Sequence, residues 1–299
     1  MPSPRANRRG MLAMVGSMAA YSVSDALTKL ASKSLPLGEV LAIRGIFTVL
    51  LIGALLTVIG QMRYLRLAMT PLILTRSAFD ALSSGCYVAA LIHMRIAEVA
   101  SVVMIAPLIL TALSVMVYSE DAGWRRWCAV VVGFIGVLFV VKPTPDAFNA
   151  WALVALFGTT LGASREMLTR RIDTSMPTLV ITFVSVSMLT MVGCSVGATE
   201  HWRPIGWPEM SYLAVAACFY SLATYLTVLA FRDVIVSSVA PFRYTFLIFA
   251  GIAGYLVFRE LPDGWSAFGA ALIVASGLYA LHREVVRRRE LTATTPAAQ

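Results

Sequence analysis

Charged side chains inside long apolar segments are the features of this sequence that could carry chemistry. A charge that faces lipid at the centre of a bilayer costs at least about 2.5–3.5 kcal/mol, so such side chains are expected to face one another or a polar interior. Many of them recur at the three- and four-residue spacing of a single helix face. The residues concerned are Tyr21, Asp25 and Lys29; Arg44; Arg76, Asp80, Ser83, Ser84 and Tyr87; Thr159, Gly162, Arg165, Glu166 and Thr169; and Ser237, Pro241, Arg243 and Tyr244.

The arginines of this set suggest recognition of an anion. A guanidinium binds a carboxylate or phosphate through two parallel hydrogen bonds, and binds it more strongly where water is scarce. Arg243 has no acidic residue three or four positions away, which favours a role in a binding cavity over a local ion pair. We therefore predict a central cavity whose substrate-binding residues are Arg243, Tyr244, Arg76, Asp80, Tyr87, Tyr21 and Arg44.

The acidic residues in the spans have two interpretations. A carboxylate buried in a carrier can take up and release a coupled proton, and the candidates in order of depth and isolation are Asp25, Asp80 and Glu166. A nearby cation would weaken that role, which leaves exchange or facilitated transport as alternatives. Three structural ion pairs are the competing interpretation: Asp25–Lys29, Arg76–Asp80 and Arg165–Glu166.

Two prolines and two glycines mark irregular or closely packed helices. Pro107 and Pro241 each remove a backbone hydrogen bond inside a predicted span, which favours a kink, and both are candidates for a hinge. Gly193 and Gly197 form a GxxxG motif, which is used more often for close packing within a bundle than for a dimer contact.

The elements that must hold these side chains are membrane-spanning helices. The chain has 299 residues, of which 59% are hydrophobic and 13% charged, and its mean hydropathy is +0.79. A soluble domain has about 45–50% apolar and about 25% charged residues. Apolar runs of the roughly 20 residues that cross a bilayer recur along the chain and predict an all-α integral membrane protein with ten transmembrane helices. The predicted spans are Met11–Ser32, Gly38–Gly60, Pro71–His93, Ala97–Tyr118, Trp124–Val141, Ala150–Ile172, Pro177–Ala198, Met210–Phe231, Ile235–Phe258 and Trp265–His282.

The distribution of basic residues predicts the orientation. An even number of spans puts both termini on one side, and with the termini inside roughly 14 Lys and Arg lie on the cytoplasmic side and roughly 5 outside. We expect a multi-pass protein of the plasma membrane, the inner membrane in a bacterium, with both termini cytoplasmic. The basic N-terminal stretch and the apolar run after it are interpreted as a first transmembrane helix rather than a cleaved leader.

Several function classes are disfavoured. The net charge of +8 comes from loops and chain ends without a basic face interleaved with aromatics, which argues against nucleic acid. The sequence contains no GxxxxGK[ST] motif, no clustered histidines and no CxxC spacing. We expect no enzyme activity, cofactor or metal. The expected partners are a small-molecule substrate and membrane lipid, with a proton or a counter-substrate as the coupled species; the oligomeric state is open.

A weak internal repeat divides the chain. A shift of 140 residues superposes Ala90 on Ala230 and Glu120 on Glu260 and keeps its register across two helices. Because each half has five predicted spans, the second half must enter the membrane from the opposite side. This arrangement is an inverted repeat, which lets the halves of a transporter exchange inward-open and outward-open shapes.

The same stretches resemble EamA-type transporters of the drug/metabolite transporter superfamily. The resemblance covers roughly residues 10 to 288 and is carried by residues 240–245, 255–263 and 270–279, and in the first half by 25–29, Arg44, 106–108 and Glu120. The family usually has glycine before the acidic residue at the two repeat-equivalent loops, where this chain has Ser119 and Arg259; glycine would allow a tighter turn there. The resemblance implies an electrochemically driven carrier of amino acids, nucleotide-related molecules, vitamins or other metabolites.

Together these patterns predict a secondary active transporter that moves an amino-acid-like or other carboxylate-bearing compound by alternating access. A proton-independent exchanger or facilitator of nucleotide-related compounds or vitamins is the alternative, followed by a passive channel. The predicted parts are a cytoplasmic tail at residues 1–10, five-helix repeats at 11–143 and 144–283, and a cytoplasmic tail at 284–299.

Overall fold

The computed structural model describes residues 4–118, 124–141, 149–169, 171–173, 175–230 and 239–294. These residues form helices and connecting turns, without a strand among them. The first half contains α1 (Pro4–Ala31), α2 (Leu37–Val58), the 3-10 helix η1 (Met62–Leu65), α3 (Pro71–His93), α4 (Ile96–Val103), α5 (Ala106–Tyr118) and α6 (Trp124–Val141). The second half contains α7 (Ala150–Thr169), α8 (Thr178–Gly197), α9 (Trp207–Ala230), the 3-10 helix η2 (Ala240–Tyr244), α11 (Thr245–Phe258) and α12 (Gly264–Thr294).

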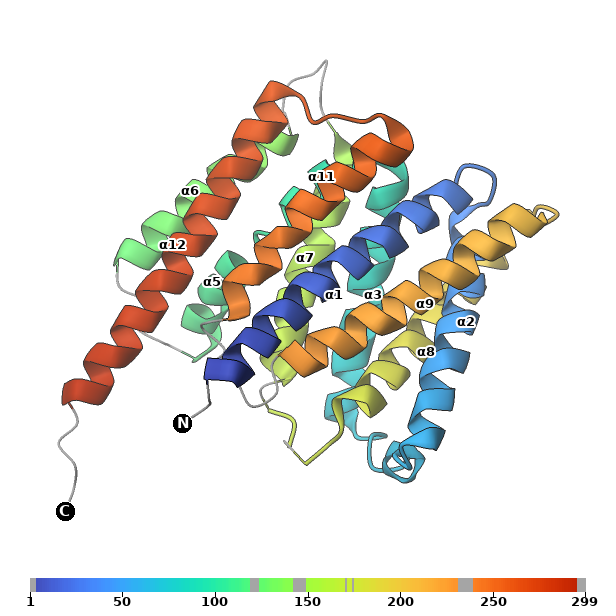
Figure 1. Ribbon diagram of the computed structural model, residues 1–299, viewed down its shortest axis with the longest axis horizontal. Coiled ribbons are helices and arrows are strands. Elements are labelled where there is room, and N and C mark those ends of the chain that lie inside the picture. Colours follow the sequence, from blue (N-terminus) through green and yellow to red (C-terminus); the bar gives the residue numbers. More distant parts are fainter. Residues whose placement is uncertain are drawn as a thin grey trace.

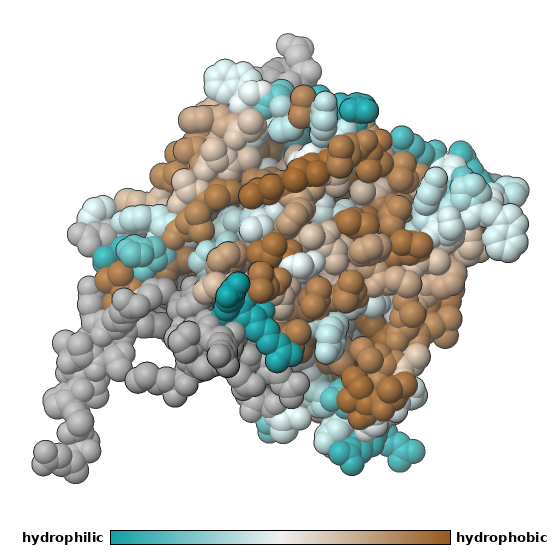
Figure 2. All heavy atoms as spheres, in the orientation of Figure 1, coloured by the Kyte–Doolittle hydropathy of each residue, from teal (hydrophilic) through white to brown (hydrophobic). Residues whose placement is uncertain are grey.

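The helices form one bundle in which α1 starts, and α12 finishes, at the same end (Figure 1). We call this the proximal end, and we call the opposite end, where α1 finishes and α12 begins, the distal end. Apolar side chains cover much of the flank of the bundle, and hydrophilic residues gather toward its ends (Figure 2). This distribution matches a protein whose flank faces lipid.

Six helices in the described part of the chain are long and apolar enough to cross a membrane. They are Leu37–Val58, Ile96–Val117 (α4 and α5 taken together), Thr178–Gly197, Trp207–Ala230, Ala240–Phe258 (η2 and α11 taken together) and Gly264–Arg283. Trp127–Val141 is a shorter apolar helix. The long helices α1, α3 and α7 fall outside this group. These three helices carry acidic and basic side chains within their length, which lowers their mean hydropathy.

The predicted span Ala97–Tyr118 is not one continuous helix. The backbone forms a turn at Met104 and Ile105, which separates α4 from α5. Pro107 lies in the first turn of α5, where a missing N–H group is tolerated, and its ring excludes a continuous helix through this point. Pro241 likewise lies in the first turn of η2, ahead of α11. Pro107 thus begins a separate helix instead of kinking one, and the part of the predicted span that precedes Val239 lies outside the described residues. The loop Ser119–Gly123, which includes Glu120, lies outside the described residues, as does Ser237.

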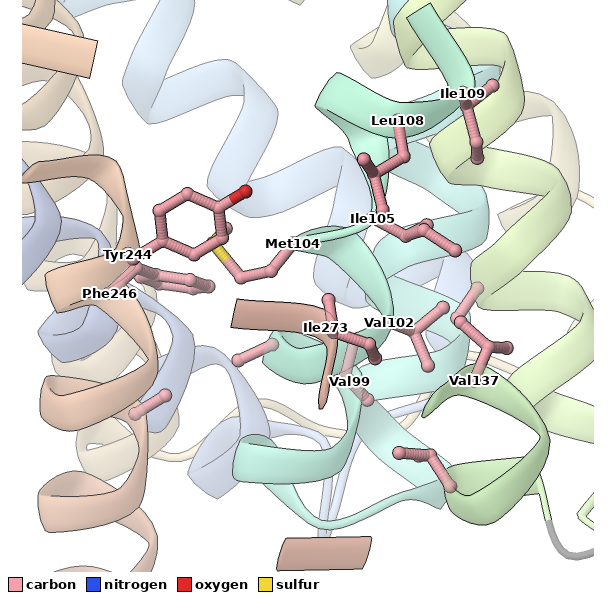
Figure 3. Packing of buried hydrophobic residues seen from close by; sticks show 14 of the residues in the cluster. Val99, Val102, Met104, Ile105, Leu108, Ile109, Val137, Tyr244, Phe246 and Ile273 are labelled. Atoms are coloured by element: carbon pink, nitrogen blue, oxygen red, sulfur yellow. The ribbon is translucent and has the colours of Figure 1, made fainter. Parts of the chain in front are cut away.

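The main apolar core lies around this break. Met104, Ile105 and Leu108 pack with Tyr244 and Phe246 of the other half, and Ile273 of α12 and Val137 of α6 complete the contact (Figure 3). Residues from both halves thus share one core. Burial of these side chains fixes α4, α5, η2 and α11 against one another, which positions the polar residues that flank η2.

Helices α2 and α8 approach each other through glycines. A Cβ on Gly38 would lie 2.3 Å from the backbone N of Gly197, and a Cβ on Gly193 would lie 2.7 Å from the backbone N of Ala42. Any side chain at these positions would force the two backbones apart. The GxxxG motif therefore serves packing within the bundle, as predicted.

Arg259, at a position where the family usually has glycine, has a left-handed conformation at the end of α11. Its φ is 57° and its ψ is 25°, a region that costs a residue with a Cβ about 1–2 kcal/mol. The guanidinium lies 5.4 Å from the Tyr255 ring, a contact worth about 0.5–1 kcal/mol at an exposed site. We expect the free energy of unfolding of Arg259→Gly to exceed that of Arg259→Ala by about 1 kcal/mol, so the glycine variant should unfold at a higher temperature.

Thermal unfolding of the two variants in detergent tests this expectation. Both variants lose the Tyr255 contact, so the comparison isolates the backbone conformation. Equal unfolding temperatures for the two would contradict the left-handed assignment.

Candidate functional site

Asp80 lies at the centre of a buried cluster of charges. Its carboxylate binds Arg76 of the same helix at 2.9 Å and Arg165 of α7 at 2.7 Å. Arg76 also donates to the hydroxyls of Ser185 at 2.7 Å and Thr169 at 3.2 Å. The predicted pair Arg76–Asp80 is therefore confirmed, and three helices, α3, α7 and α8, meet at this point.

The cluster continues through Glu166 to Arg243. Glu166 accepts from its neighbour Arg165 at 3.3 Å, which confirms that predicted pair, and lies 3.6 Å from Arg243 of η2. We call the five residues Arg76, Asp80, Arg165, Glu166 and Arg243 the charge network; with three cations and two carboxylates its formal charge is +1. The exposed fraction of the side chains rises along it, from 12% at Arg76 through 26% at Arg165 to 41% at Arg243. Arg243 is therefore both the most accessible cation and the most weakly held.

Asp25 lies in a second polar cluster, on α1. The Tyr87 hydroxyl donates to its carboxylate at 2.5 Å. Arg44 donates to the Thr28 hydroxyl at 3.2 Å and lies 5.3 Å from the Tyr220 ring. Asp25 is 5% exposed, and within the described residues no Lys or Arg nitrogen comes within the 4.0 Å of an ion pair. Asp25 is a buried carboxylate whose hydrogen-bond partner, among the described residues, is the Tyr87 hydroxyl.

The predicted pair between Asp25 and Lys29 is wrong. Lys29 instead binds both carboxylate oxygens of Glu260 at 2.8 and 2.9 Å and the backbone carbonyl of Met94 at 2.7 Å. One turn of helix separates Asp25 from Lys29 on α1, but the lysine side chain extends toward the distal end. The acceptors come from the α3–α4 and α11–α12 connections, which no local spacing rule could identify.

The tyrosines of the predicted site lie in different surroundings. The Tyr21 hydroxyl is 3.2 Å from that of Thr224, and its ring meets the Tyr220 ring edge-on at 5.7 Å between centroids. The Tyr244 side chain is buried in the apolar core beside Met104 (Figure 3), where a Cβ on Gly277 would lie 1.8 Å from its hydroxyl oxygen. Tyr244 is thus packed into the core, whereas Tyr21 and Tyr87 join polar clusters.

Tyr220 belongs to the polar cluster around Arg44 and Tyr21, and the sequence did not predict it. It faces Arg44 and Tyr21 from α9, and it lies in an apolar span without a charged neighbour at helical spacing. Arg165 was predicted only as the ion-pair partner of Glu166, but it bridges Asp80 and Glu166. The sequence did contain an indication of this role for Arg165. The residue lies beside the polar helix face that Thr159, Gly162 and Glu166 form.

A bundle of apolar helices with charged side chains paired in its interior is the architecture of a multi-pass membrane protein. The resemblance to EamA-type transporters of the drug/metabolite transporter superfamily is confirmed, because residues 8–142 match the EamA-like transporter family. The match is to a family of transporters, and the protein is not an enzyme.

Curated relatives agree with this class. The chain is 29% identical to the S-adenosylmethionine uptake transporter of Rickettsia prowazekii over 178 residues, which is 60% of each chain, so it aligns with less than two thirds of that relative's length. It is 26% identical to the pseudopaline exporter of Pseudomonas aeruginosa over 270 residues, 90% of this chain and 94% of the relative. It is 25% identical to the riboflavin transporter of Rhizobium johnstonii over 217 residues, 73% of this chain and 72% of the relative.

A solved crystal structure shares the fold. It superposes with a TM-score of 0.54 at 20% sequence identity and covers 94% of this chain and 98% of its own. At this identity the likeness shows the architecture alone.

Proposed function

We propose that the protein is a secondary transporter that carries a small carboxylate-bearing metabolite across the plasma membrane by alternating access, with Arg243 as the anion-binding residue. The observation that carries the proposal is the contrast within the charge network. Arg76 and Arg165 are held by Asp80 at 2.9 and 2.7 Å, whereas Arg243 is held by Glu166 at 3.6 Å and is 41% exposed. A substrate carboxylate could therefore replace Glu166 at Arg243 and form two charge-assisted hydrogen bonds.

The order of the clusters along the bundle supports a path through the interior. The charge network lies toward the proximal end, where Thr169, its exposed hydrogen-bond partner, ends α7. Asp25 and Tyr87 lie deeper, and Lys29 follows one turn later on α1. Polar groups thus continue through an otherwise apolar bundle, which is the expected lining of a substrate pathway.

The packing of the helices supports two inverted five-helix repeats, at residues 11–143 and 144–283. In such a repeat α1 corresponds to α7, and α3 corresponds to α9. A two-fold axis in the membrane plane would then relate the contact between α1 and α9 to the contact between α7 and α3. Both contacts are present. The same axis maps the contacts α2–α8 and α6–α12 onto themselves. The 140-residue shift also places Met104, at the break before α5, on Tyr244, at the end of η2. In this arrangement α1, α3, α6 and α7 are spans as well, which together with the six long apolar helices gives ten.

The orientation is part of the proposal. Helix α1 begins and helix α12 finishes at the proximal end (Figure 1), and the positive-inside rule assigns that end to the cytoplasm. The relatives include proteins named for uptake and for export, and together they support a metabolite carrier in either direction.

Asp25 is the residue that we assign to proton coupling. Asp80 binds two arginines and Glu166 binds two, and a proton on either would have to displace a cation. Among the described residues Asp25 has no ion-pair partner within 4.0 Å, and a buried carboxylate without one is costly when ionised and far less costly when protonated. Substrate exchange without a proton is the alternative mechanism.

Counterflow in proteoliposomes tests the proposed function. Vesicles loaded with an unlabelled carboxylate metabolite should transiently accumulate the labelled compound from outside, because an alternating-access carrier returns loaded. Candidate compounds come from a thermal-shift screen, since a ligand of the folded state raises the unfolding temperature. Labelled flux without trans-stimulation, in proportion to concentration, would instead identify a channel.

A further inference from the structure

Lys29 is committed to three acceptors at the distal end of the bundle. Its ammonium group has three N–H donors, and it lies within 2.9 Å of the two Glu260 oxygens and the Met94 carbonyl. The Phe258 ring lies 4.9 Å from the same nitrogen. The lysine side chain is 9% exposed and that of Glu260 is 26% exposed. The cation is thus fully satisfied and largely removed from water.

These contacts join three parts of the chain that belong to different helices. Lys29 is in the last turns of α1, Met94 follows α3, and Glu260 follows α11. The position of Glu260 is fixed, because its N–H group donates to the Gly254 carbonyl at 3.1 Å across the left-handed Arg259. One side chain therefore ties α1 of the first half to the α11–α12 connection of the second.

A second layer of polar contacts surrounds the first. Arg95 lies 3.6 Å from Glu98 and 3.8 Å from Asp263. The Ser266 hydroxyl is 2.7 Å from Asp263 and 3.3 Å from Glu98. These residues start α4 and α12, so two neighbouring sets of polar contacts hold the distal ends: one joins α1, α3 and α11, and the other joins α4 and α12.

We propose that Lys29 and Glu260 form the distal gate of the transport path, and that the pair must separate in each transport cycle. The inference rests on the proposed function. The charge network is partly exposed toward the proximal end, whereas the next charged group beyond Asp25 on α1 is Lys29, in its closed pair. The structure is therefore closed at the distal end, and opening that end requires α1 to part from the α11–α12 connection.

The pair is suited to this role because its closed and open states are both accessible. A lysine and a glutamate that separate into water regain hydration, so the net free energy of the contact is smaller than its short distances suggest. Loss of one partner while the other stays buried is costly. Removing either charge should thus shift the equilibrium toward the distally open state.

Distal accessibility of an interior cysteine tests the gate. Ser84 lies on the α3 face between Asp80 and Tyr87, and Ser84→Cys would be made with Cys86, Cys128, Cys194 and Cys218 replaced by serine. Vesicles are sorted by the accessibility of a C-terminal tag, and a membrane-impermeant maleimide is applied from the distal side. We expect Lys29→Met and Glu260→Gln to raise the labelling rate at least about tenfold, equivalent to a shift of about 1.4 kcal/mol.

Two controls separate a gate from general damage. Arg203→Met removes a cation at the same end, where its side chain donates to the Ser34 carbonyl, and should leave the distal labelling rate unchanged. Lys29→Arg keeps the charge and should stay closed. Glu260→Gln is close in shape to the native residue, and a single symmetrical peak in gel filtration verifies its fold.

The outcomes distinguish this inference from the proposed function. Unchanged distal labelling in both Lys29→Met and Glu260→Gln overturns the gate, even if the wild-type protein shows counterflow. Absence of counterflow for every compound that stabilises the wild-type protein counts against the carrier, whatever the labelling shows. An equal rise in the Arg203→Met control also overturns the gate, because opening would then not depend on this pair.

Discussion

Replacing Arg243 by alanine is expected to abolish transport of a carboxylate substrate in proteoliposomes. The guanidinium is the exposed cation of the charge network, and its ion pair with Glu166 is the longest of the four that form it. Loss of a charge-assisted, two-point contact to a carboxylate costs about 3 kcal/mol, or a factor of about 100 in binding. Arg76 and Arg165, the other arginines of the charge network, cannot replace Arg243, since both already bind Asp80.

Two variants serve as controls for Arg243→Ala. Arg243→Lys keeps the charge but loses the planar two-point geometry, so we expect intermediate transport with a raised KM. Arg63→Ala makes the same chemical change at a position in η1, where the side chain lies 5.0 Å from the Tyr64 ring, and should transport normally. Normal counterflow by Arg243→Ala would remove this residue from the binding site.

Replacing Asp25 by asparagine is expected to uncouple transport from the pH gradient and to preserve exchange. In the wild-type protein, imposing a one-unit pH gradient across the vesicle should change the steady-state accumulation of substrate by about tenfold per coupled proton, because a tenfold ratio corresponds to about 1.4 kcal/mol. The asparagine keeps a group of similar size that accepts from Tyr87 but binds no proton. Accumulation by Asp25→Asn should therefore not depend on the gradient, while counterflow at equal pH continues.

The matched control for Asp25→Asn is Asp173→Asn. Asp173 is an exposed carboxylate in the connection between α7 and α8, and hydrogen bonds from the Ser175 backbone N–H and hydroxyl hold its pKa below the ordinary value. It stays ionised at the pH of the assay and should not affect coupling. A wild-type protein that shows counterflow but ignores the pH gradient would be an exchanger or facilitator, and Asp25 would then have another role.

The sequence predicted the helices well because their signals are local. The spans 71–93 and 124–141 coincide with α3 and α6, since apolar composition and the flanking polar residues define both ends. Local spacing likewise predicted the Arg76–Asp80 pair. The departure from glycine at Arg259 marked an unusual turn, but the left-handed conformation itself was not predicted.

Contacts between distant segments could not be read in the same way. Lys29 could pair with Asp25 at four residues' distance or with a carboxylate 231 residues away, and only the tertiary arrangement decides between them. Similarly, Arg243 has no acidic neighbour on its own helix, but the fold brings Glu166 within 3.6 Å. The break at Met104 was missed because Pro107 was interpreted as a kink inside one helix, whereas it begins a new one.

The glycine contact between α2 and α8 limits how the two halves can move. Backbone atoms meet there with no side chain between them, so neither helix can slide along the other without a steric clash. A second contact of this kind joins α6 to α12, where a Cβ on Gly136 would lie 2.8 Å from the Gly269 carbonyl oxygen. In the proposed alternating-access cycle, these two close contacts would form the axis about which the halves rock, while the helices that carry the charges move.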